Sequence, residues 1–424
     1  MHVAQLLAAE AIDAVLTGRN LSSAIEAVLK HHSHITPQQR GAMQDLSYGT
    51  LRHYGQLQAL LSPLLQKPLS NTRLRCLLLV ALYQLQQDRA GAHTVVDQAV
   101  QAAGSFKPQW AKGLVNAILR NFLRQRDALL AAIQNDDVAS YSYPQWWINK
   151  LRKQYPQDWQ AMLLAGNQHP PMSLRVNLRQ TSMADYVARL DAQGISADVV
   201  GDSALLLHKP LPVERIPGFS SGEVSVQDAG AQLAAPLLDA QDGMRVLDAC
   251  CAPGGKTGHL LELARLDLLA LDSDALRLQR VKSNLDRLNL QATLLAADAA
   301  QPDGWWDGRP FDRILADVPC TASGIVRRHV DIKWLRREAD VASFAQQQAR
   351  ILPALWQLLA KGGKLLYVTC SVFHEENQSQ IDGFIKQQVD ARQLPLSSPM
   401  LPPQGQLHPA AHHDGFFYAM LQKI

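Results

Sequence analysis

The fold of this chain is decided by residues 246–257, which read Val-Leu-Asp-Ala-Cys-Cys-Ala-Pro-Gly-Gly-Lys-Thr. An apolar run that enters a turn with two glycines and continues into helix-forming residues predicts a strand, a loop and the start of a helix. The glycines allow a ligand to approach the backbone closely, and the first helical turn offers unpaired N–H groups. The turn ends in Gly-Lys-Thr, as a phosphate loop does, but that pattern needs a glycine where Cys250 stands. We therefore expect a ligand-binding turn that is not the phosphate loop of a nucleotide triphosphatase.

Strand-like and helix-like stretches alternate from Val226 to the end of the chain. Such alternation predicts a parallel, doubly wound α/β sheet with helices on both faces. The expected strands are 245–248, 268–272, 292–297, 311–317, 364–369 and 416–421. The expected helices are 257–264, 275–288, 339–359 and 375–388. Ligands of such sheets bind beyond the carboxyl ends of the strands, so reactive side chains are sought there.

Residues 1–225 follow different patterns. Apolar residues recur at spacings of three and four throughout residues 1–140, which predicts an all-α domain. Its expected helices are 3–16, 22–31, 37–61, 74–85, 95–103 and 110–126. An aromatic-rich connector begins near Tyr141 and leads into a strand at 172–177 and a helix at 183–193, which predicts a small α+β module. The expected domains are therefore 1–140, 141–225 and 226–424.

Composition excludes several classes of protein. The hydrophobic fraction of 47% and the charged fraction of 19% are ordinary for a globular chain, and 424 residues suffice for two or three domains. The longest apolar run, 76–83, is much shorter than the roughly 20 residues that cross a bilayer, so we expect no membrane partner and no secretory leader. The five cysteines are odd in number and form no CxxC pair. This argues against disulfides and a zinc ribbon and favours the reducing cytoplasm.

Three successive expected strands end in groups suited to a nucleoside. The first leads into the glycine turn, the second ends in Asp272, and the third leads to Asp298. An acidic side chain after the second strand accepts hydrogen bonds from ribose hydroxyls in dinucleotide folds. Each aspartate alone is equally well explained as a helix cap, but the ordered series favours a nucleoside. Because the glycine turn departs from GxGxxG, the predicted cofactor is S-adenosylmethionine.

Asp317, Cys320 and Cys370 follow the ends of two further strands at the same edge of the sheet. Their chemistry suits methyl transfer to carbon 5 of cytosine, which becomes nucleophilic once a thiolate has added to carbon 6. An acid near ring nitrogen 3, the role expected for Asp317, stabilises the charge that develops. A second cysteine can assist the later release of the thiolate. An ordinary thiol has a pKa of about 8.5, so the attacking cysteine needs help from nearby arginines or from the helix after Cys370. The chemistry does not choose which cysteine attacks.

Positive charge is concentrated in two places. The net charge of +3 divides into +4 for residues 1–140, +1 for 141–225 and −2 for 226–424. Within the acidic last segment, residues 325–337 hold five Lys or Arg side chains, one Asp and one tryptophan. Charge runs are usually solvated faces, but this one follows the Pro-Cys motif directly, so we expect a strip that binds RNA phosphates. Its basic residues are Arg327, Arg328, Lys333, Arg336 and Arg337.

Several stretches together resemble the RNA cytosine-5 methyltransferases of the RsmB/NOP family. These stretches are 248–257, 317–324 (Asp-Val-Pro-Cys-Thr-Ala-Ser-Gly), 327–329, 331–334 and 369–371 (Thr-Cys-Ser). Residues 225–229 resemble the opening of that family's catalytic domain, and 95–100 and 113–120 resemble a NusB-type RNA-binding domain. The resemblance implies an all-α NusB-like domain, a small α+β middle module and a Rossmann-like class I methyltransferase domain. It also implies methylation of one cytosine in 16S rRNA, either naked or in a partly assembled small ribosomal subunit, and we expect a monomer.

The resemblance further implies a role for each matching residue. Cys370 matches the thiol that forms the covalent adduct, and Cys320 matches the thiol that aids its release. Asp272 would hold the ribose, Asp298 would lie near the adenine, and Asp317 would border both cofactor and base. The residues around the methionine part of the cofactor would be Cys250, Cys251, Ala252, Pro253, Gly254, Gly255 and Lys256. Two departures are visible, because Cys251 replaces an alanine of the family pattern and Thr321-Ala-Ser replaces Ser-Gly-Thr.

Two other functions stay open on the sequence. A tRNA cytosine-5 methyltransferase would use the same chemistry, although the NusB-like domain favours rRNA. A non-catalytic RNA-binding assembly factor would not need Cys320, Cys370 and Asp317 together. We expect no metal, because the 14 histidines include no HExxH motif and His374-Glu-Glu lacks a second histidine.

Overall fold

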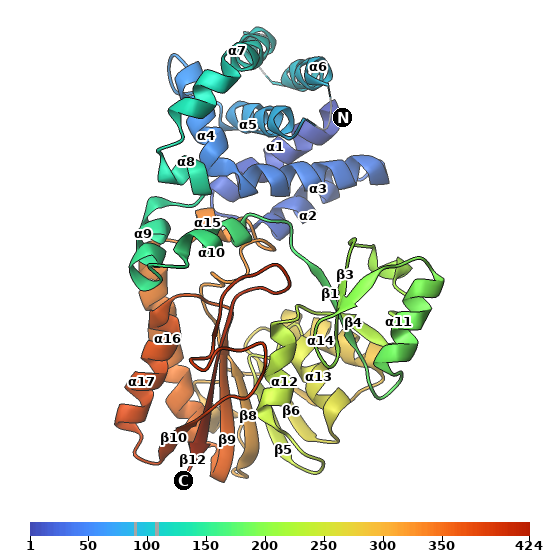
Figure 1. Cartoon of the computed structure of the whole chain (residues 1–424), viewed down its shortest axis with the longest axis vertical. Coiled ribbons are helices and arrows are strands. Elements are labelled where there is room, and N and C mark those ends of the chain that lie inside the picture. The colour runs from blue at the N-terminus through green and yellow to red at the C-terminus, as the bar shows by residue number, and fades with distance from the viewer. Residues whose placement is uncertain (89–90, 107–109) are drawn as a thin grey trace. The chain divides into compact units, whose positions relative to one another are not determined.

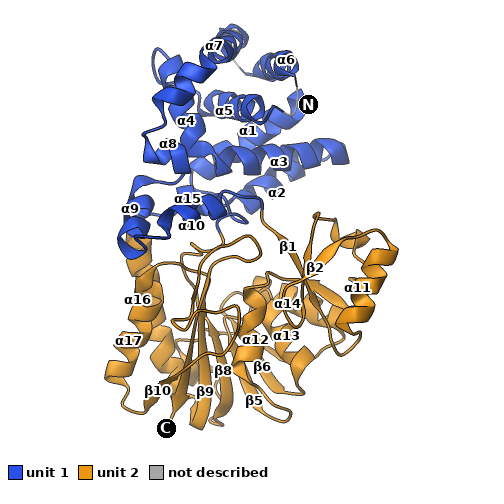
Figure 2. Ribbon diagram, in the orientation of Figure 1, with its two compact units in different colours: residues 1–169, 326–338 blue, residues 170–325, 339–424 orange. Residues whose placement is uncertain are grey.

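The structure is a computed structural model that describes residues 1–88, 91–106 and 110–424. The chain divides into two compact units (Figure 2). Unit 1 comprises residues 1–169 and 326–338, and unit 2 comprises residues 170–325 and 339–424. Residues 141–169, which we expected in a middle module, belong to unit 1 and form helices α9 (Gln145–Gln154) and α10 (Trp159–Gly166). The chain therefore leaves unit 1, enters unit 2, returns to unit 1 and ends in unit 2.

The regular elements described in unit 1 are helices (Figure 1). They are α1 (His2–Leu16), α2 (Leu21–His31), α3 (Pro37–Arg52), α4 (Tyr54–Leu61), η1 (Ser62–Leu64), α5 (Thr72–Gln87), α6 (Ala92–Ala103), α7 (Trp110–Ala132), α8 (Asp137–Tyr141), α9, α10 and α15 (Ile332–Leu335). Helix α5 lies at the centre of the bundle, since every residue from Cys76 to Leu85 is buried. The all-α prediction is confirmed, and Cys76 is buried in the core of the bundle.

The single helix expected over 37–61 is instead two helices that meet at His53. The backbone carbonyl of Arg52 accepts a hydrogen bond from Lys333 Nζ at 2.9 Å, and the carbonyl of Leu51 accepts one from Trp334 Nε1 at 2.8 Å. A side chain that takes the last carbonyl groups of a helix ends that helix. Local periodicity does not reveal this break, because the side chains that cause it come from the second half of the chain.

Residues 326–338 thus complete unit 1 from the second half of the chain. Val330 is buried in the hydrophobic core of the helices. Asp331 Oδ2 accepts a hydrogen bond from the backbone N–H of Leu21, 2.9 Å away at the start of α2. The Trp334 ring packs edge-on against Tyr54, with centroids 4.8 Å apart. An acid at a helix start and a cation at a helix end both match the helix dipole, so the segment is an integral part of the bundle.

Unit 2 begins with a small antiparallel sheet. Its strands are β1 (Met172–Val176), β2 (Ala197–Val199), β3 (Ala204–Leu207) and β4 (Val224–Val226), in the order β2-β3-β1-β4. Helix α11 (Met183–Ala192) buries Tyr186 and Leu190 against it. The predicted strand and helix are confirmed. Strands β2 to β4 were not predicted, because such short runs carry too little periodicity.

The large sheet of unit 2 has the order β10-β12-β9-β8-β5-β6-β7, with β11 paired to β12. Its strands are β5 (Arg245–Ala249), β6 (Asp267–Asp272), β7 (Thr293–Ala296), β8 (Phe311–Asp317), β9 (Leu359–Thr369), β10 (Ala391–Leu394), β11 (Gln406–Leu407) and β12 (Phe416–Lys423). The helices of this part are α12 (Ala234–Leu238), α13 (Gly255–Leu263), α14 (Ala275–Leu288), α16 (Glu338–Gln357) and α17 (Gln378–Gln387), with η2 (Val213–Arg215), η3 (Ala231–Leu233), η4 (Pro302–Gly304) and η5 (His374–Glu376) between them.

The expectation of a wholly parallel sheet is wrong. Strands β5 to β9 are parallel, but β12 runs antiparallel to β9, with Tyr367 opposite Ala419. Helix α17 connects β9 to β10, and residues 395–415, all of which the structure describes, return the chain to β12 without a helix, so β12 runs antiparallel to both of its neighbours. The mixed sheet nevertheless keeps the carboxyl ends of the parallel strands at one edge.

Candidate active site

The glycine turn joins β5 to α13, as predicted. Cys250 and Gly254 have positive φ angles of 63° and 95°. A Cβ atom on Gly254 would lie 3.1 Å from the Cα atom of Val281 in α14, so both the backbone conformation and the close packing require glycine there. The N–H of Cys251 donates to the carbonyl of Leu271 at the end of β6 at 2.8 Å. The turn is therefore held in place by the neighbouring strand.

Two buried acids lie behind this turn. Asp272, 2% exposed, accepts a hydrogen bond from the N–H of Ala252 at 3.1 Å and pairs with Arg277 at 3.5 Å. Asp248 accepts one from the Thr257 hydroxyl at 2.6 Å, and its other oxygen, Oδ1, is buried without a hydrogen-bond partner among the described residues. Burial raises the pKa of Asp248 to about 7. Carboxylate oxygens beside an open glycine turn are suited to hydroxyl or amine donors of a ligand.

Our sequence reasoning missed Asp248 as a site residue. A signal was present, because an acid within an apolar strand is costly to bury without a partner. Asp298, in contrast, is exposed and lies just beyond β7. Its carboxylate accepts a hydrogen bond from the N–H of Ala300 at 2.9 Å, which is an Asx turn. It also lines a cavity of about 340 Å³ together with residues of α16, which are Ser343, Gln346, Gln347, Arg350 and Ile351.

Lys256, at the start of α13, forms an ion pair with Asp317 at the end of β8, with Nζ 2.5 Å from Oδ2. Burial lowers the pKa of Lys256, but Asp317 and the charge of Cys370 outweigh that effect and raise it above its usual value. The lysine therefore stays an ammonium ion close to Cys370. We expected arginines or a helix start to support that thiolate, but α17 begins only at Gln378, and the cation facing the sulfur is Lys256.

The structure brings the two predicted cysteines into contact. Cys320 Sγ lies 3.4 Å from Cys370 Sγ. The pairing of β8 with β9 explains this proximity, since Asp317 lies opposite Val368 and each cysteine follows shortly after its strand. The hydrogen bond to Cys370 and burial raise the pKa of Cys320 well above its usual value. Cys320 is therefore the member of the pair that keeps its proton.

The other two cysteines of the site are packing residues of the turn. Cys251 is 5% exposed and lies in the core cluster that contains Leu260 and Val281. Burial raises the pKa of both Cys250 and Cys251, so both remain neutral thiols. A small apolar side chain serves equally well at Cys251, which explains why the departure from alanine is accommodated. Any contact of Cys251 with a ligand is left to its backbone.

The basic strip expected in residues 325–337 is corrected by the structure. Arg327 is 1% exposed and Lys333 is fully buried in unit 1. Lys333 donates to Asn167 Oδ1 at 2.7 Å as well as to Arg52, and its ammonium lies 4.3 Å from the Tyr143 ring centroid. These two side chains pack inside the helical bundle and do not face solvent. Arg328, Arg336 and Arg337 retain accessible surface.

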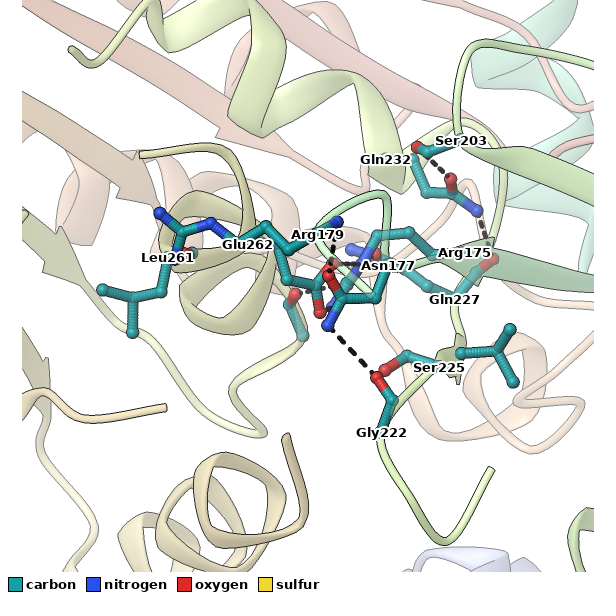
Figure 3. A network of polar contacts seen from close by, with 12 residues as sticks. Arg175, Asn177, Arg179, Ser203, Gly222, Ser225, Gln227, Gln232, Leu261 and Glu262 are labelled. Carbon is teal, nitrogen blue, oxygen red and sulfur yellow. Dashed lines mark hydrogen bonds and ion pairs between the residues drawn. The ribbon is translucent and has the colours of Figure 1, made fainter. Parts of the chain in front are cut away.

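A buried ion pair fixes the small sheet to the glycine turn (Figure 3). Arg175 of β1 donates from Nε and Nη2 to the Glu262 carboxylate of α13, at 2.8 and 2.6 Å, and both side chains are at most 3% exposed. Arg175 Nη1 also donates to the carbonyl of Gly255 at 2.7 Å. Bidentate pairs of this kind are geometrically specific, so the small sheet orients the first turn of α13. Sequence reasoning missed this pair, because its partners lie far apart in the chain.

Two further observations concern the described residues as a whole. Within residues 1–88, 91–106 and 110–424, no cluster of three or more His, Cys, Asp or Glu residues is arranged to hold a metal ion. Across the same part of the chain, no helix combines the length and the apolar character that crossing a membrane requires.

Comparisons with known proteins divide the chain into three parts, of which the second spans the boundary at residue 169 between the two units. Three family models match the chain: the NusB family over residues 2–124, the RsmF/B-like ferredoxin-like domain over 143–214, and 16S rRNA methyltransferase RsmB/F over 235–422. Ribosomal RNA small subunit methyltransferase B of Pseudomonas syringae pv. tomato is 44% identical over 99% of this chain and 97% of its own length. The protein of that name from Vibrio cholerae is 41% identical over 100% and 98%. The crystal structure of PH0851 has the same fold, with a TM-score of 0.81 and 24% identity over 100% of this chain and 99% of that one.

Proposed function

The chain belongs to the RsmB/F family of 16S rRNA methyltransferases, and we propose that it methylates carbon 5 of a cytosine through a covalent adduct with Cys370. The methyl donor in this proposal is S-adenosylmethionine. The observation that carries the proposal is the contact of 3.4 Å between the sulfur atoms of Cys320 and Cys370, next to the Lys256–Asp317 pair. Neither thiol forms a disulfide. Methylation at a ring carbon needs a nucleophile and a second group that helps to release this nucleophile afterwards.

The residues around the glycine turn fit a nucleoside-containing donor. The unpaired Asp248 Oδ1 and the carboxylate of Asp272 lie beside the turn and can accept hydrogen bonds from amino or hydroxyl groups. When bound, S-adenosylmethionine supplies an electrophilic methyl group. The turn residues 250–256 and Asp272 would hold it close to the thiols.

Attack begins with the Cys370 thiolate, whose negative charge the nearby Lys256 ammonium stabilises. The sulfur forms a bond to carbon 6, and the ring electrons shift toward carbon 5 and nitrogen 3. Asp317, which pairs with Lys256, would interact with the nitrogen edge of the base. Carbon 5 would then take the methyl group as the sulfur–methyl bond of the donor breaks and leaves a neutral thioether, and carbon 5 would still carry its proton.

Release of the methylated base requires a group that removes the carbon 5 proton. Cys320 would act as this base after Cys370 has bonded to carbon 6. Hydrogen bonding to Cys370 is the largest cause that raises the pKa of Cys320. Once Cys370 is bonded to carbon 6 it carries no charge, so its contribution is removed and the pKa of Cys320 falls toward its usual value, although burial and the Glu376 carboxylate still raise it. Its thiolate removes the carbon 5 proton, the bond from sulfur to carbon 6 breaks, and the Cys370 thiolate returns.

The RNA itself is proposed to contact both units. The target base must leave its stack to reach two thiols, as flipped or loop nucleotides do. Arg328, Arg336 and Arg337 keep accessible positive charge for phosphates, whereas Arg327 and Lys333 do not.

Methyl transfer from tritiated S-adenosylmethionine to 16S rRNA tests the proposal, with bisulfite sequencing to locate the product. We expect a protected cytosine with the wild-type chain and no incorporation with Cys370→Ala. Incorporation at a position that bisulfite treatment converts would place the methyl group elsewhere and overturn the proposed target atom.

A further inference from the structure

A buried carboxylate, Glu376, lies behind the two cysteines of the site. It is the last residue of η5, it is 0% exposed, and sequence reasoning assigned it no role. Its backbone carbonyl accepts a hydrogen bond from the Tyr367 hydroxyl at 2.7 Å, so the residue is tied to strand β9. The position of Glu376 is thus fixed by the same strand that leads to Cys370.

The carboxylate binds the residue that follows each cysteine. Thr321, directly after Cys320, donates to it from its backbone N–H at 2.7 Å and from its hydroxyl at 2.5 Å. Ser371, directly after Cys370, donates its hydroxyl at 2.5 Å. One side chain therefore connects the two loops that present the sulfur atoms.

Further contacts brace this connection. Ser323 Oγ lies 3.0 Å from Ser371 Oγ and accepts a hydrogen bond from the N–H of Val372 at 2.9 Å. Gln348 of α16 donates to the carbonyl of Pro319 at 2.9 Å and to the Glu376 carboxylate at 3.5 Å. The residues that depart from the family pattern, Thr321 and Ser323, take part in this network through their hydroxyl groups.

Among the described residues, the donors that contact the Glu376 carboxylate are hydroxyl and amide groups, which carry no positive charge. Burying a carboxylate among neutral donors is costly, and a glutamine would avoid the charge but would offer one accepting oxygen in place of two. Burial raises the pKa of Glu376, while the hydrogen bonds from Ser371 and Thr321 oppose that effect and favour the anion. Both oxygen atoms of Glu376 are therefore used as acceptors between the two cysteine loops, an arrangement that a glutamine cannot reproduce.

We propose that Glu376 is the positioning residue of the thiol pair: its carboxylate holds the loops of Cys320 and Cys370 together and keeps the proton on Cys320. The assignment of the two cysteines rests on the proposed function, but the contacts of Glu376 do not. A negative charge close to Cys320 disfavours its thiolate, whereas the other sulfur, that of Cys370, interacts with the Lys256 ammonium.

The test is alkylation of the full chain by iodoacetamide over a range of pH, without RNA or methyl donor, with peptide mass spectrometry to follow each cysteine. In Glu376→Gln, which removes the charge and keeps the shape, we expect the midpoint for Cys320 to fall by about one pH unit, and its alkylation at neutral pH to rise about tenfold. Methylation by the same variant should fall about 10- to 100-fold, because the sulfur atoms lose their fixed geometry.

Glu375→Gln is the matched control, since it makes the same chemical change one residue away, and it should leave the Cys320 profile unchanged. Thr321→Val covers the outcome in which Glu376→Gln does not fold. It removes one hydrogen bond from the carboxylate and so lowers the population of the anion, which should shift the Cys320 profile in the same direction by a smaller amount.

An unchanged Cys320 profile in folded Glu376→Gln overturns the proposal, as does an unchanged profile in Thr321→Val if the first variant is unfolded. The alkylation assay contains no substrate, so its result is independent of the proposed function. A shifted Cys320 profile in a chain that methylates no RNA would support the role of Glu376 and contradict the function alone.

Discussion

The ammonium group of Lys333 donates a hydrogen bond to the backbone carbonyl of Arg52, the last residue of α3, although 281 positions separate the two residues in the chain. A cation at the end of a helix is favourable, but this one is fully buried, and burial lowers its pKa well below the usual value. Burying this charge is unfavourable, but the contact satisfies the carbonyl group of Arg52 and fixes the end of α3.

Replacing Lys333 by alanine should destabilise unit 1. The variant leaves the carbonyl of Arg52 and the amide oxygen of Asn167 without their donor and opens a cavity. We expect the free energy of unfolding to fall by about 2–4 kcal/mol. Urea denaturation checks this, with Lys30→Ala on the surface of α2 as a control that should change stability by less than about 0.5 kcal/mol. Equal effects of the two variants would contradict the role of Lys333.

His53, between α3 and α4, should make unit 1 sensitive to acid. Burial, followed by the charges of Lys333 and Arg52, lowers its pKa from 6.5 to about 4. Between pH 4 and 6.5 the unfolded chain therefore binds a proton that the folded chain does not, so stability falls as the pH falls through this window. The loss should reach about 3 kcal/mol near pH 4.

Hydrogen exchange of the α5 amides measures this loss for unit 1 specifically. His53→Gln should flatten the pH dependence of exchange protection between pH 4 and 6.5. His208→Gln, which changes an exposed histidine of unit 2, should not. The explanation is wrong if both variants retain the wild-type slope.

Breaking the pair of Arg175 with Glu262 should affect stability and donor binding separately. Arg175→Met leaves the Glu262 carboxylate buried without its partner, so unfolding should become easier by about 3–5 kcal/mol. It also removes the hydrogen bond to Gly255, so binding of S-adenosylmethionine, measured by calorimetry, should weaken several-fold.

The double variant Arg175→Met with Glu262→Leu separates the two effects. It removes both charges, so stability should recover, but the hydrogen bond to Gly255 is still missing and donor binding should stay weak. Recovery of both properties would mean that Arg175 affects the turn through stability alone.

The two cysteines should respond differently to substitution. Cys320→Ala removes the base that releases the adduct, so it should accumulate protein bound covalently to RNA, visible as a band that survives denaturing electrophoresis. Cys370→Ala should form no adduct and no methylated product, and the double variant should behave in the same way. A stable adduct in Cys370→Ala would exchange the roles of the two sulfur atoms.

The local sequence was sufficient to predict an element when the residues of that element, and those next to it, determine where it begins and ends. Helix α14 was predicted with its observed bounds because Asp274 accepts hydrogen bonds from the first turn and Asn289 adopts the left-handed conformation that ends it. Strand β8 was also predicted with its observed bounds, 311–317. The paired cysteines followed in turn, since parallel strands place their carboxyl ends at one edge.

Sequence reasoning failed where a distant residue decides the outcome. The break at His53 depends on Lys333 and Trp334, and burial of the expected basic strip depends on helices from the first half of the chain. The direction of β12 depends on its place between β9 and β10, which only the assembled sheet defines. Glu376 was overlooked because its importance lies in its contacts with Thr321 and Ser371, not in a motif.

Residues 326–338 also determine when unit 1 can finish folding during synthesis. Residues 1–169 leave the ribosome before unit 2 begins, yet Val330 and the groups that end α3 arrive only after residues 170–325 have been made. At roughly 5–20 residues per second, the helices wait about 10–30 s for the segment that completes them. A nascent chain stalled before residue 326 should therefore carry an exposed apolar site in its N-terminal bundle, which a chaperone can bind and which closes once residue 338 has emerged.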